Sequence, residues 1–227
     1  DFIGAVRERW SMDYAHPDPA QVLAEIGRRL NGAREKLAPD LWARLQGVGV
    51  AAPLSLGGWH ALLGMPADVA ARWAATDLRS EVAGLTELPV QSVKDTAAAC
   101  VAELVAGRGR SVKSFLYVFV DTFIGGGLVI DSHLHAGLHG NAGAIGSMPL
   151  GLSRGGTANP TPQLLSVASL LNLEQSFIDA GLDPSAASDT RALQAPWRPH
   201  TRRWLNDAAS AIALAANSAA CLLDLDG

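Results

Sequence analysis

Cysteine, charged residues and long apolar runs are scarce in this sequence, and each shortage narrows the class of protein. The two cysteines, Cys100 and Cys221, are too few and too far apart for a disulfide framework or a zinc knuckle. Both stand in alanine-rich stretches, so we expect buried free thiols. Charged residues make up 18% of the chain, the net charge is -4 and the pI is near 5.8. This acidic balance argues against general nucleic-acid binding.

No apolar run reaches the roughly 18 residues that a membrane span needs. The first residues do not have the pattern of a signal peptide. We therefore expect a cytoplasmic protein without a membrane partner.

What the chain does contain is apolar and small. Hydrophobic residues make up 48% of the sequence, and there are 23 glycines and 12 prolines. The apolar share excludes disorder, and so many glycines and prolines exclude a coiled coil. The length of 227 residues allows one large domain or two small lobes, each with its own core.

Hydrophobic spacing predicts alternating strands and helices. Asp18 and Pro19 are typical of a helix start. The predicted strands cover residues 1–13, 47–53, 88–92, 114–120 and 128–130. The predicted helices cover residues 18–37, 77–85, 94–106, 162–181, 184–194 and 199–223. This order is typical of an α/β protein.

Asp95 follows a predicted strand and begins a predicted helix. Ligands of α/β proteins bind at the carboxyl ends of strands. A carboxylate at such a place can accept a proton from a substrate hydroxyl during phosphoryl transfer. The alternative interpretation is a helix N-cap, since aspartate is a preferred capping residue.

Three consecutive glycines, Gly125, Gly126 and Gly127, separate two predicted strands, and we expect them to form a hairpin turn. Such a turn presents backbone N–H groups that can cradle phosphate. A tight hairpin that needs positive φ angles is the alternative. The segment is not a Walker loop, because no Gly-Lys-Ser/Thr follows.

Three histidines, His133, His135 and His139, lie within seven residues of one another. Such spacing is seen in metal sites. No cysteine or carboxylate cluster completes a ligand set here, so we expect no bound metal.

The order and spacing of several motifs resemble the ROK family of repressors, ORFs and sugar kinases. The matching segments are Gly47–Pro53, Trp73–Val90, Lys94–Glu103, Asp121–Ile130, Gly140–Met148 and Ala211–Leu225. The resemblance implies the actin-like ATPase (ribonuclease-H-like) fold, a two-lobed α/β architecture with mixed sheets flanked by helices.

The resemblance also implies a division into an N-terminal lobe over residues 1–106 and a C-terminal lobe over 107–227. The family begins with a strand and a phosphate motif that have no counterpart before Phe2. It continues with a strand and an adenosine-binding turn past the position of Gly227. We therefore expect both lobes to be incomplete and the chain alone to bind ATP poorly.

The site residues follow from the same resemblance. Asp95 matches the catalytic base. The sugar-binding positions are Pro53, Leu54, Lys94, Asp95, Asn141, Ala144 and Ser147. The phosphate-binding positions are Asp121, Thr122, Phe123, Gly125 and Gly126.

Several of these positions depart from the family pattern. Lys94 replaces an asparagine, Ala144 a glutamate and Ser147 a histidine that hold the sugar in family kinases. Losing such hydrogen bonds costs roughly 1–3 kcal/mol each. Asp121 and Phe123 replace glycines of the phosphate loop, which places negative charge and bulk near the phosphates.

Leu54 departs in the same way, since it stands where the family's Pro-Gly has glycine. The zinc motif of the family needs the missing histidine and a cysteine cluster, and residues 148–175 contain no cysteine. We therefore expect no structural zinc.

These departures favour a carbohydrate-sensing domain of a transcriptional regulator, a kinase-derived pseudoenzyme that binds a sugar effector between its lobes. The resemblance implies a homodimer, and DNA would be bound only through a segment outside this chain. The alternative is a sugar kinase with an unusual substrate, which would require ATP and Mg. A structural or dimerisation module without a ligand is the third interpretation. The residues assign no cofactor by themselves.

Overall fold

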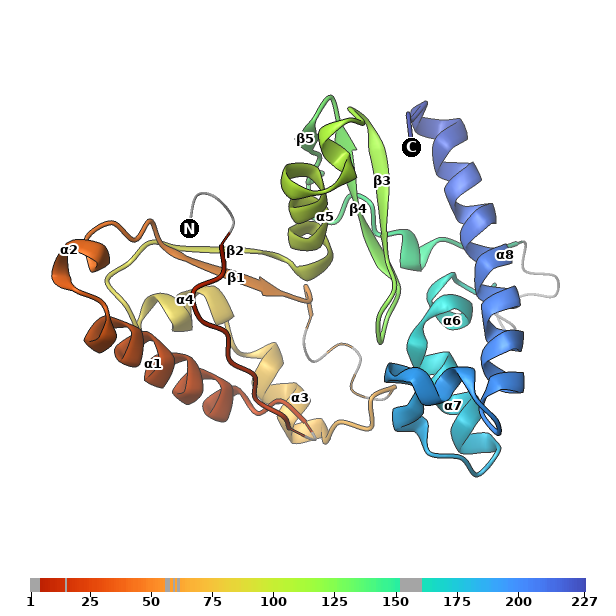
Figure 1. Ribbon diagram of the computed structural model, residues 1–227, viewed down its shortest axis with the longest axis horizontal. Helices are drawn as coiled ribbons and strands as arrows, with labels where there is room; N and C mark the ends of the chain where they lie inside the picture. Colours follow the sequence, from red (N-terminus) through yellow and green to blue (C-terminus); the bar gives the residue numbers. More distant parts are fainter. Residues whose placement is uncertain (1–4, 15, 56–57, 59, 61, 152–160) are drawn as a thin grey trace. The chain divides into compact units, whose positions relative to one another are not determined.

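The computed structural model describes residues 5–14, 16–55, 58, 60, 62–151 and 161–227 (Figure 1). The chain divides into two units, Asp1–Asp95 and Thr96–Gly227. Both contain helices and strands, as the composition and the spacing of apolar residues predicted. Within the described residues, no helix combines the length and the hydropathy of a membrane span.

The first unit is built on a parallel pair of strands, β1 (Val48–Ala52) and β2 (Val90–Lys94), in which Ala52 lies opposite Lys94. Its helices are α1 (Pro19–Lys36), α2 (Pro39–Trp42), α3 (Ala67–Ala74) and α4 (Leu78–Ala83).

Helix α1 begins where the sequence predicts. Asp18 is its N-cap, and the carboxylate accepts hydrogen bonds from the N–H groups of Ala20 and Gln21. The same carboxylate pairs with Arg72 of α3 at 2.7 Å. The Trp73 indole N–H donates to the carbonyl oxygen of Pro17 at 2.6 Å. These contacts hold the start of α1 against α3, whose apolar face forms the core of the unit with Met65.

The second unit contains an antiparallel sheet in the order β3-β4-β5, formed by β3 (Phe115–Phe119), β4 (Gly125–Ile130) and β5 (His133–Leu134). Its helices are α5 (Asp95–Ala106), which starts at the boundary residue, α6 (Leu165–Ala168), α7 (Leu170–Asp179) and α8 (Arg198–Leu223). Short 3₁₀ helices lie at residues 108–110, 145–147, 184–188 and 190–193.

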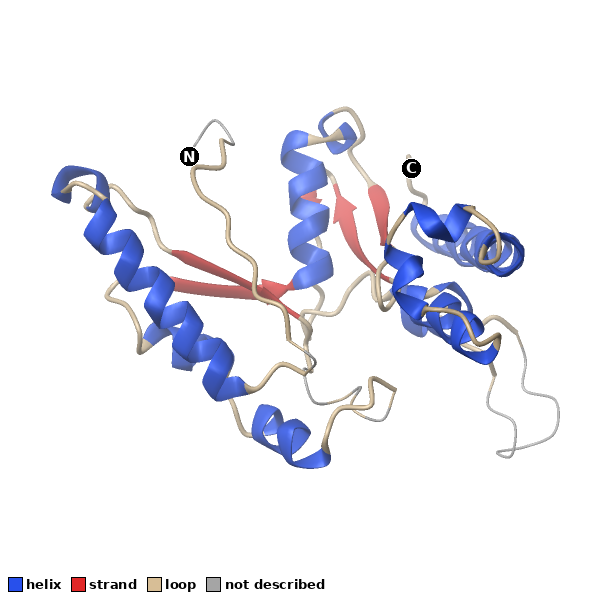
Figure 2. Ribbon diagram, turned by 60° about the horizontal axis from the view of Figure 1, so that its bottom comes forward, coloured by secondary structure: helices blue, strands red, loops and turns tan. Residues whose placement is uncertain are grey.

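The sheet of the second unit is covered on both faces, with α5 on one side and α6 and α8 on the other (Figures 1 and 2). Alternate side chains of β3 serve the two faces, as the period of a strand requires. Phe115 and Tyr117 pack with Cys100 of α5, whereas Leu116 and Val118 pack with α8. Helix α8 contributes a stripe of small residues to this core, Ala208, Ala211 and Ala215.

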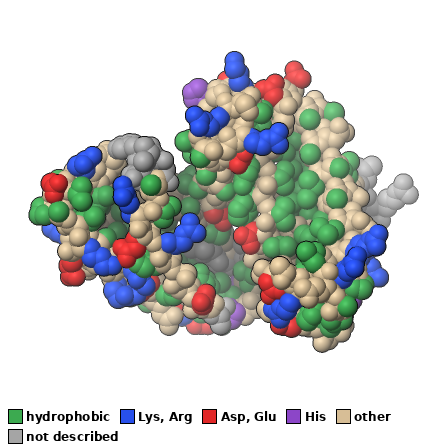
Figure 3. Space-filling model, viewed as in Figure 1, with side chains coloured by type: hydrophobic (Ala, Val, Ile, Leu, Met, Phe, Trp, Pro, Cys, Tyr) green, Lys and Arg blue, Asp and Glu red, His purple; other side chains and the backbone are tan. Residues whose placement is uncertain are grey.

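The outer edge of β3 also receives the last residues of the chain. The N–H of Asp226 donates to the carbonyl of Ser114, and the N–H of Leu116 donates to a carbonyl oxygen of Gly227. Hydrophobic side chains gather over β3 and α8 in the space-filling view (Figure 3). The exposed large hydrophobic residues of α8 are Leu205, Leu214, Leu222 and Leu223.

Several predictions from the sequence are wrong. The part of residues 1–13 that the structure describes is not a strand and belongs to neither of the two described sheets. The predicted helix over 162–181 is broken at Ser169, and the one over 184–194 is replaced by 3₁₀ turns. Cys100 is buried as expected, and burial raises the pKa of its thiol to about 11, but Cys221 is exposed.

Candidate functional site

Four of the predicted sugar-binding residues meet at the carboxyl edge of the parallel strands in the first unit. Lys94 is the last residue of β2 and lies opposite Ala52, the last residue of β1. Pro53 and Leu54 follow Ala52 directly, and both are exposed. Asp95 follows Lys94 and begins α5. This edge is where α/β proteins bind ligands, because loops and helix starts converge there.

Lys94 and Asp95 are half-buried, and their charges are coupled. Burial lowers the pKa of the Lys94 ammonium, and the negative charge of Asp95 partly opposes this shift. The edge therefore offers one cation and one carboxylate side by side, which suits a ligand with both hydrogen-bond donors and acceptors.

Thr96 continues the chain into the second unit and anchors the start of α5 on β4. Its buried hydroxyl donates to the carbonyl oxygen of Gly126 at 2.9 Å. The residue was not among the predicted site positions. Its small β-branched side chain directly after Asp95 was the one available signal.

The three glycines lie within strand β4 and are buried, so the prediction that they form a hairpin turn is wrong. Helix α5 packs closely against two of them, Gly125 and Gly127. A Cβ on Gly125 would lie 2.9 Å from Cγ2 of Thr96, and one on Gly127 would lie 2.6 Å from Cβ of Cys100. A Cβ on Gly126 would collide with the backbone oxygen of Tyr117. Close packing thus requires the glycines whether or not phosphate binds nearby, with α5 over Gly125 and Gly127 and the backbone of Tyr117 and Gly143 beside Gly126.

The turn that joins β3 to β4 covers residues 120–124 and docks on the start of α7. The N–H groups of Leu170 and Leu171 donate to the carbonyl oxygens of Asp121 and Thr122, at 2.9 and 3.3 Å. The Ile124 N–H donates to the buried Ser169 hydroxyl at 3.0 Å. The turn is therefore held by the first backbone donors of a helix and by its N-cap side chain.

This turn carries negative charge at the predicted phosphate positions. Asp121 is exposed, and its carboxylate accepts a hydrogen bond from the Thr122 N–H at 2.7 Å. Glu174 of α7 has a raised pKa, first because it is partly buried and second because of the charge of Asp121. A phosphate here would face two carboxyl groups, which like-charge repulsion disfavours. Phe123, the third residue of the turn, is half-buried.

The remaining sugar-binding predictions, Asn141, Ala144 and Ser147, are linked by consecutive turns. The Ala144 N–H donates to the carbonyl of Asn141, and the Ser147 N–H donates to the carbonyl of Ala144. Their segment lies against β4, where a Cβ on Gly143 would stand 2.6 Å from the backbone carbon of Gly127. Ala144 provides no polar side-chain group at this place.

The structure thus arranges the predicted residues in two groups, each within its own unit. Pro53, Leu54, Lys94 and Asp95 form the first group; the second contains the turn, Gly125, Gly126 and the segment with Asn141, Ala144 and Ser147. The chain passes from one to the other through Lys94, Asp95 and Thr96. Among the described residues no cluster of three or more metal-ligating side chains occurs, and the three histidines of residues 133–139 are exposed.

Sequence reasoning missed Ser169 and Glu174, which support the turn and set its charge. Both lie in a stretch that reads as continuous helix. The serine cap inside that stretch was the available signal, because serine is favoured at helix starts.

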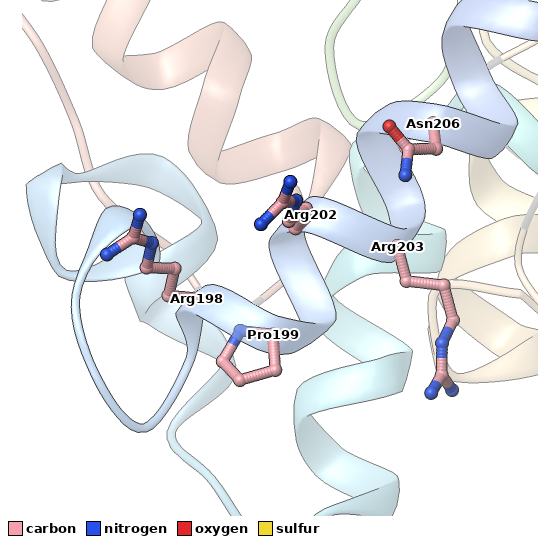
Figure 4. A pocket seen from close by; sticks show the side chains of 5 residues that line it. All are labelled: Arg198, Pro199, Arg202, Arg203 and Asn206. Atoms are coloured by element: carbon pink, nitrogen blue, oxygen red, sulfur yellow. The ribbon is translucent and has the colours of Figure 1, made fainter.

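A shallow hollow of about 510 Å³ lies along the first turns of α8 (Figure 4). Its lining residues are Arg198, Pro199, Arg202, Arg203 and Asn206. The arginine side chains extend in different directions from the helix. None of the predicted site residues lines this hollow.

Among known proteins, both enzymes and transcriptional regulators are similar in sequence to this chain. An N-acetylmannosamine kinase from Vibrio cholerae is 32% identical over 145 residues, which cover 63% of this chain and 49% of that protein. A xylose repressor from Bacillus subtilis is 31% identical over 78 residues, 34% of this chain and 20% of the repressor. The chain thus spans half or less of the length of these relatives.

A solved structure of a ROK family transcriptional regulator, a homologue of the Escherichia coli MLC protein, superposes with a TM-score of 0.60. The match covers 95% of this chain and 56% of that one at 20% identity. Together with the related ROK kinases it shows that this chain has the actin-like ATPase fold. The sequence pattern of the ROK family matches residues 17–163, and the chain therefore belongs to the ROK family.

Proposed function

We propose that this chain is the carbohydrate-sensing domain of a ROK transcriptional regulator and that it does not phosphorylate sugars efficiently. The carboxyl groups of Asp121 and Glu174 at the turn between β3 and β4 carry the proposal. Phosphoryl transfer depends on cations and N–H donors around the phosphates. The turn instead presents carboxylates, and its N–H groups at Thr122 and Ile124 already donate to the Asp121 carboxylate and the Ser169 hydroxyl.

The sugar side of the site keeps the carboxylate at Asp95, although Lys94, Ala144 and Ser147 depart from the family pattern. Asp95 stands at the carboxyl edge of β1 and β2, where its carboxylate can accept a hydrogen bond from a sugar hydroxyl. Lys94 supplies donors beside it. This pairing supports binding of a carbohydrate without requiring its phosphorylation.

The relatives support a carbohydrate ligand, because the names of both a repressor and a kinase among them refer to sugars. In this proposal the effector binds the domain, the domain works as a cytoplasmic homodimer, and DNA is bound by a segment outside the chain. No nucleotide cofactor is needed for sensing.

Binding and turnover separate sensing from catalysis. We expect at least one sugar, amino sugar or polyol to raise the melting temperature of the protein, since a ligand of the native state stabilises it. We expect no ADP release from ATP and Mg with the same compounds. Asp95→Asn should abolish the thermal shift, whereas Asp40→Asn, an exposed aspartate of α2, should leave it unchanged.

A sugar kinase is the second candidate, favoured by the retained Asp95 and by the match to the Vibrio cholerae kinase. ADP release that depends on a sugar and is lost in Asp95→Asn would establish the kinase and overturn the sensing proposal. A protein that binds none of the compounds would overturn both.

A further inference from the structure

The position of Lys94 sets it apart from other cations of the first unit. Arg28 and Arg29 pair with Glu25 on one helix, and Arg72 pairs with Asp18 and Asp68. These arginines lie on helices and stabilise helix surfaces or helix contacts. Lys94 instead ends a strand, at the edge where the residues of the proposed sugar site converge.

The chemistry of an ammonium at this edge differs from that of a neutral amide. An ammonium has three donors and no acceptor, whereas an amide offers both. A neutral sugar hydroxyl gains little from the positive charge, but a carboxylate or phosphate forms a stronger, charge-assisted hydrogen bond. Asp95 already supplies part of the counter-charge for this half-buried ammonium, and an anionic group of a ligand would add to it.

Asp95 limits what kind of anion fits. A bare anion that contacted both side chains would be attracted by Lys94 and repelled by the adjacent carboxylate. A ligand that carries an anionic group and, at a distance from it, free hydroxyls satisfies both residues. Its anionic group faces Lys94, and a hydroxyl donates to Asp95.

We propose that Lys94 selects a sugar bearing an anionic group, a sugar phosphate or a sugar acid, over neutral sugars. The inference rests on the proposed carbohydrate-binding function and names the ligand class of the same site. Lys94 acts as a specificity residue for the anionic group, and Asp95 as the acceptor for a hydroxyl.

Titration calorimetry with the full chain tests the preference. The probes are glucose, glucose 6-phosphate, glucuronate and inorganic phosphate, at low and at physiological ionic strength. We expect glucose 6-phosphate or glucuronate to bind about tenfold or more tightly than glucose, the effect of one hydrogen bond to a charged group. The advantage should shrink as salt screens the charges, and inorganic phosphate alone should bind weakly. Which of the two anionic sugars binds distinguishes a phosphate from a carboxylate ligand.

Variants separate the role of the charge from the role of the fold. Lys94→Asn should lower the affinity for the anionic sugar about tenfold and so remove most of its advantage over glucose. Lys94→Arg keeps the charge and should keep the preference, which covers the case that the asparagine variant does not fold. Lys113→Asn, at an exposed lysine of the second unit, is the matched control and should behave as wild type.

Equal affinity for anionic and neutral sugars would overturn the inference and leave the carbohydrate-binding function standing. If Lys94→Asn leaves the ratio of the anionic-sugar affinity to the glucose affinity unchanged, the inference is likewise overturned and the carbohydrate-binding function still stands. Inorganic phosphate that binds as tightly as the sugar phosphate would also overturn it, because the hydroxyl contact to Asp95 would then contribute nothing. Failure of every sugar to bind would overturn the proposed function together with this inference.

Discussion

Glu174 shows how one residue couples charge and stability in the second unit. Its pKa is raised, first by partial burial and second by Asp121. A carboxyl with a raised pKa in the folded state binds its proton more tightly there than in the unfolded chain. Its contribution to stability is therefore fully present below the ordinary value of 4.5 and is lost as the pH rises toward the folded pKa.

We accordingly expect Glu174→Gln to raise the melting temperature at pH 7 and to leave it unchanged near pH 4. Thermal denaturation followed by circular dichroism at the two pH values measures this difference. Glu35→Gln, at an exposed glutamate of α1, should show no such dependence. A melting temperature of Glu174→Gln that stays equal to wild type at pH 7 would mean that the ionised carboxylate carries no penalty.

Ser169 is a second residue whose role is clear only in three dimensions. Its buried hydroxyl accepts from the Ile124 N–H and donates to the carbonyl of Leu165. It therefore both ends α6 and fixes the turn before β4. A sequence pattern shows a polar residue in an apolar stretch but not the distant donor that it satisfies.

Among the contacts between elements, the packing of α5 on β4 restricts the sequence most, because it leaves no room for a side chain at Gly127. We expect Gly127→Ala to destabilise the protein by about 1–3 kcal/mol, the usual cost of overpacking a core. The new Cβ would stand 2.6 Å from Cβ of Cys100, so helix and strand must separate. The urea midpoint measures the loss.

Gly32→Ala provides the contrast for that experiment. Gly32 lies in α1, and a Cβ there would meet nothing within 4 Å. Alanine is favoured over glycine inside a helix by roughly 0.5–1 kcal/mol, so this variant should be slightly more stable. If Gly127→Ala unfolds at the wild-type urea midpoint, α5 does not lie as close to β4 as in this structure.

Elements with a strong local signal could be predicted from the sequence. Asp18 and Pro19 mark the start of α1, alternating side chains mark β3, and the apolar spacing of the last helix gives α8 almost to the residue. Helix α3 was missed, because its N-cap residue is Pro66, which has no side chain that can cap the helix. The glycines of β4 were misplaced, because two of them are required by α5, a helix that is distant in the sequence: a Cβ on Gly125 would crowd Thr96, and one on Gly127 would crowd Cys100.

Part of the candidate site could also be predicted from the sequence, and part could not. The meeting of Pro53, Lys94 and Asp95 was predictable, because the carboxyl ends of neighbouring parallel strands share an edge. The docking of the 120–124 turn on α7 was not, because it depends on backbone donors of Leu170 and Leu171, which leave no mark in the sequence.

At the scale of the whole molecule, each unit has cores of its own. Trp73 lies in the core of the first unit and Phe177 in a core of the second, and both are almost fully buried. We expect calorimetry to resolve two unfolding transitions. Trp73→Ala should lower the free energy of unfolding of the first unit alone, by about 3–5 kcal/mol. Phe177→Ala should lower that of the second unit alone, by a similar amount.

Domains with separate cores behave as separate cooperative units. A single transition that both variants lower equally would show instead that the two units unfold as one. The same scans with a bound sugar report whether the ligand stabilises one transition or both.

The close fit of α5 on the glycines of β4 has a consequence for reading related sequences. In this fold Gly125 and Gly127 are required by α5, and Gly126 by the backbone of Tyr117 and Gly143, whether the protein transfers phosphate or has lost that activity. A surviving glycine run is therefore no sign of a working kinase. Asp121, Phe123 and Lys94 are the informative positions, because they stand where the family pattern has other residues.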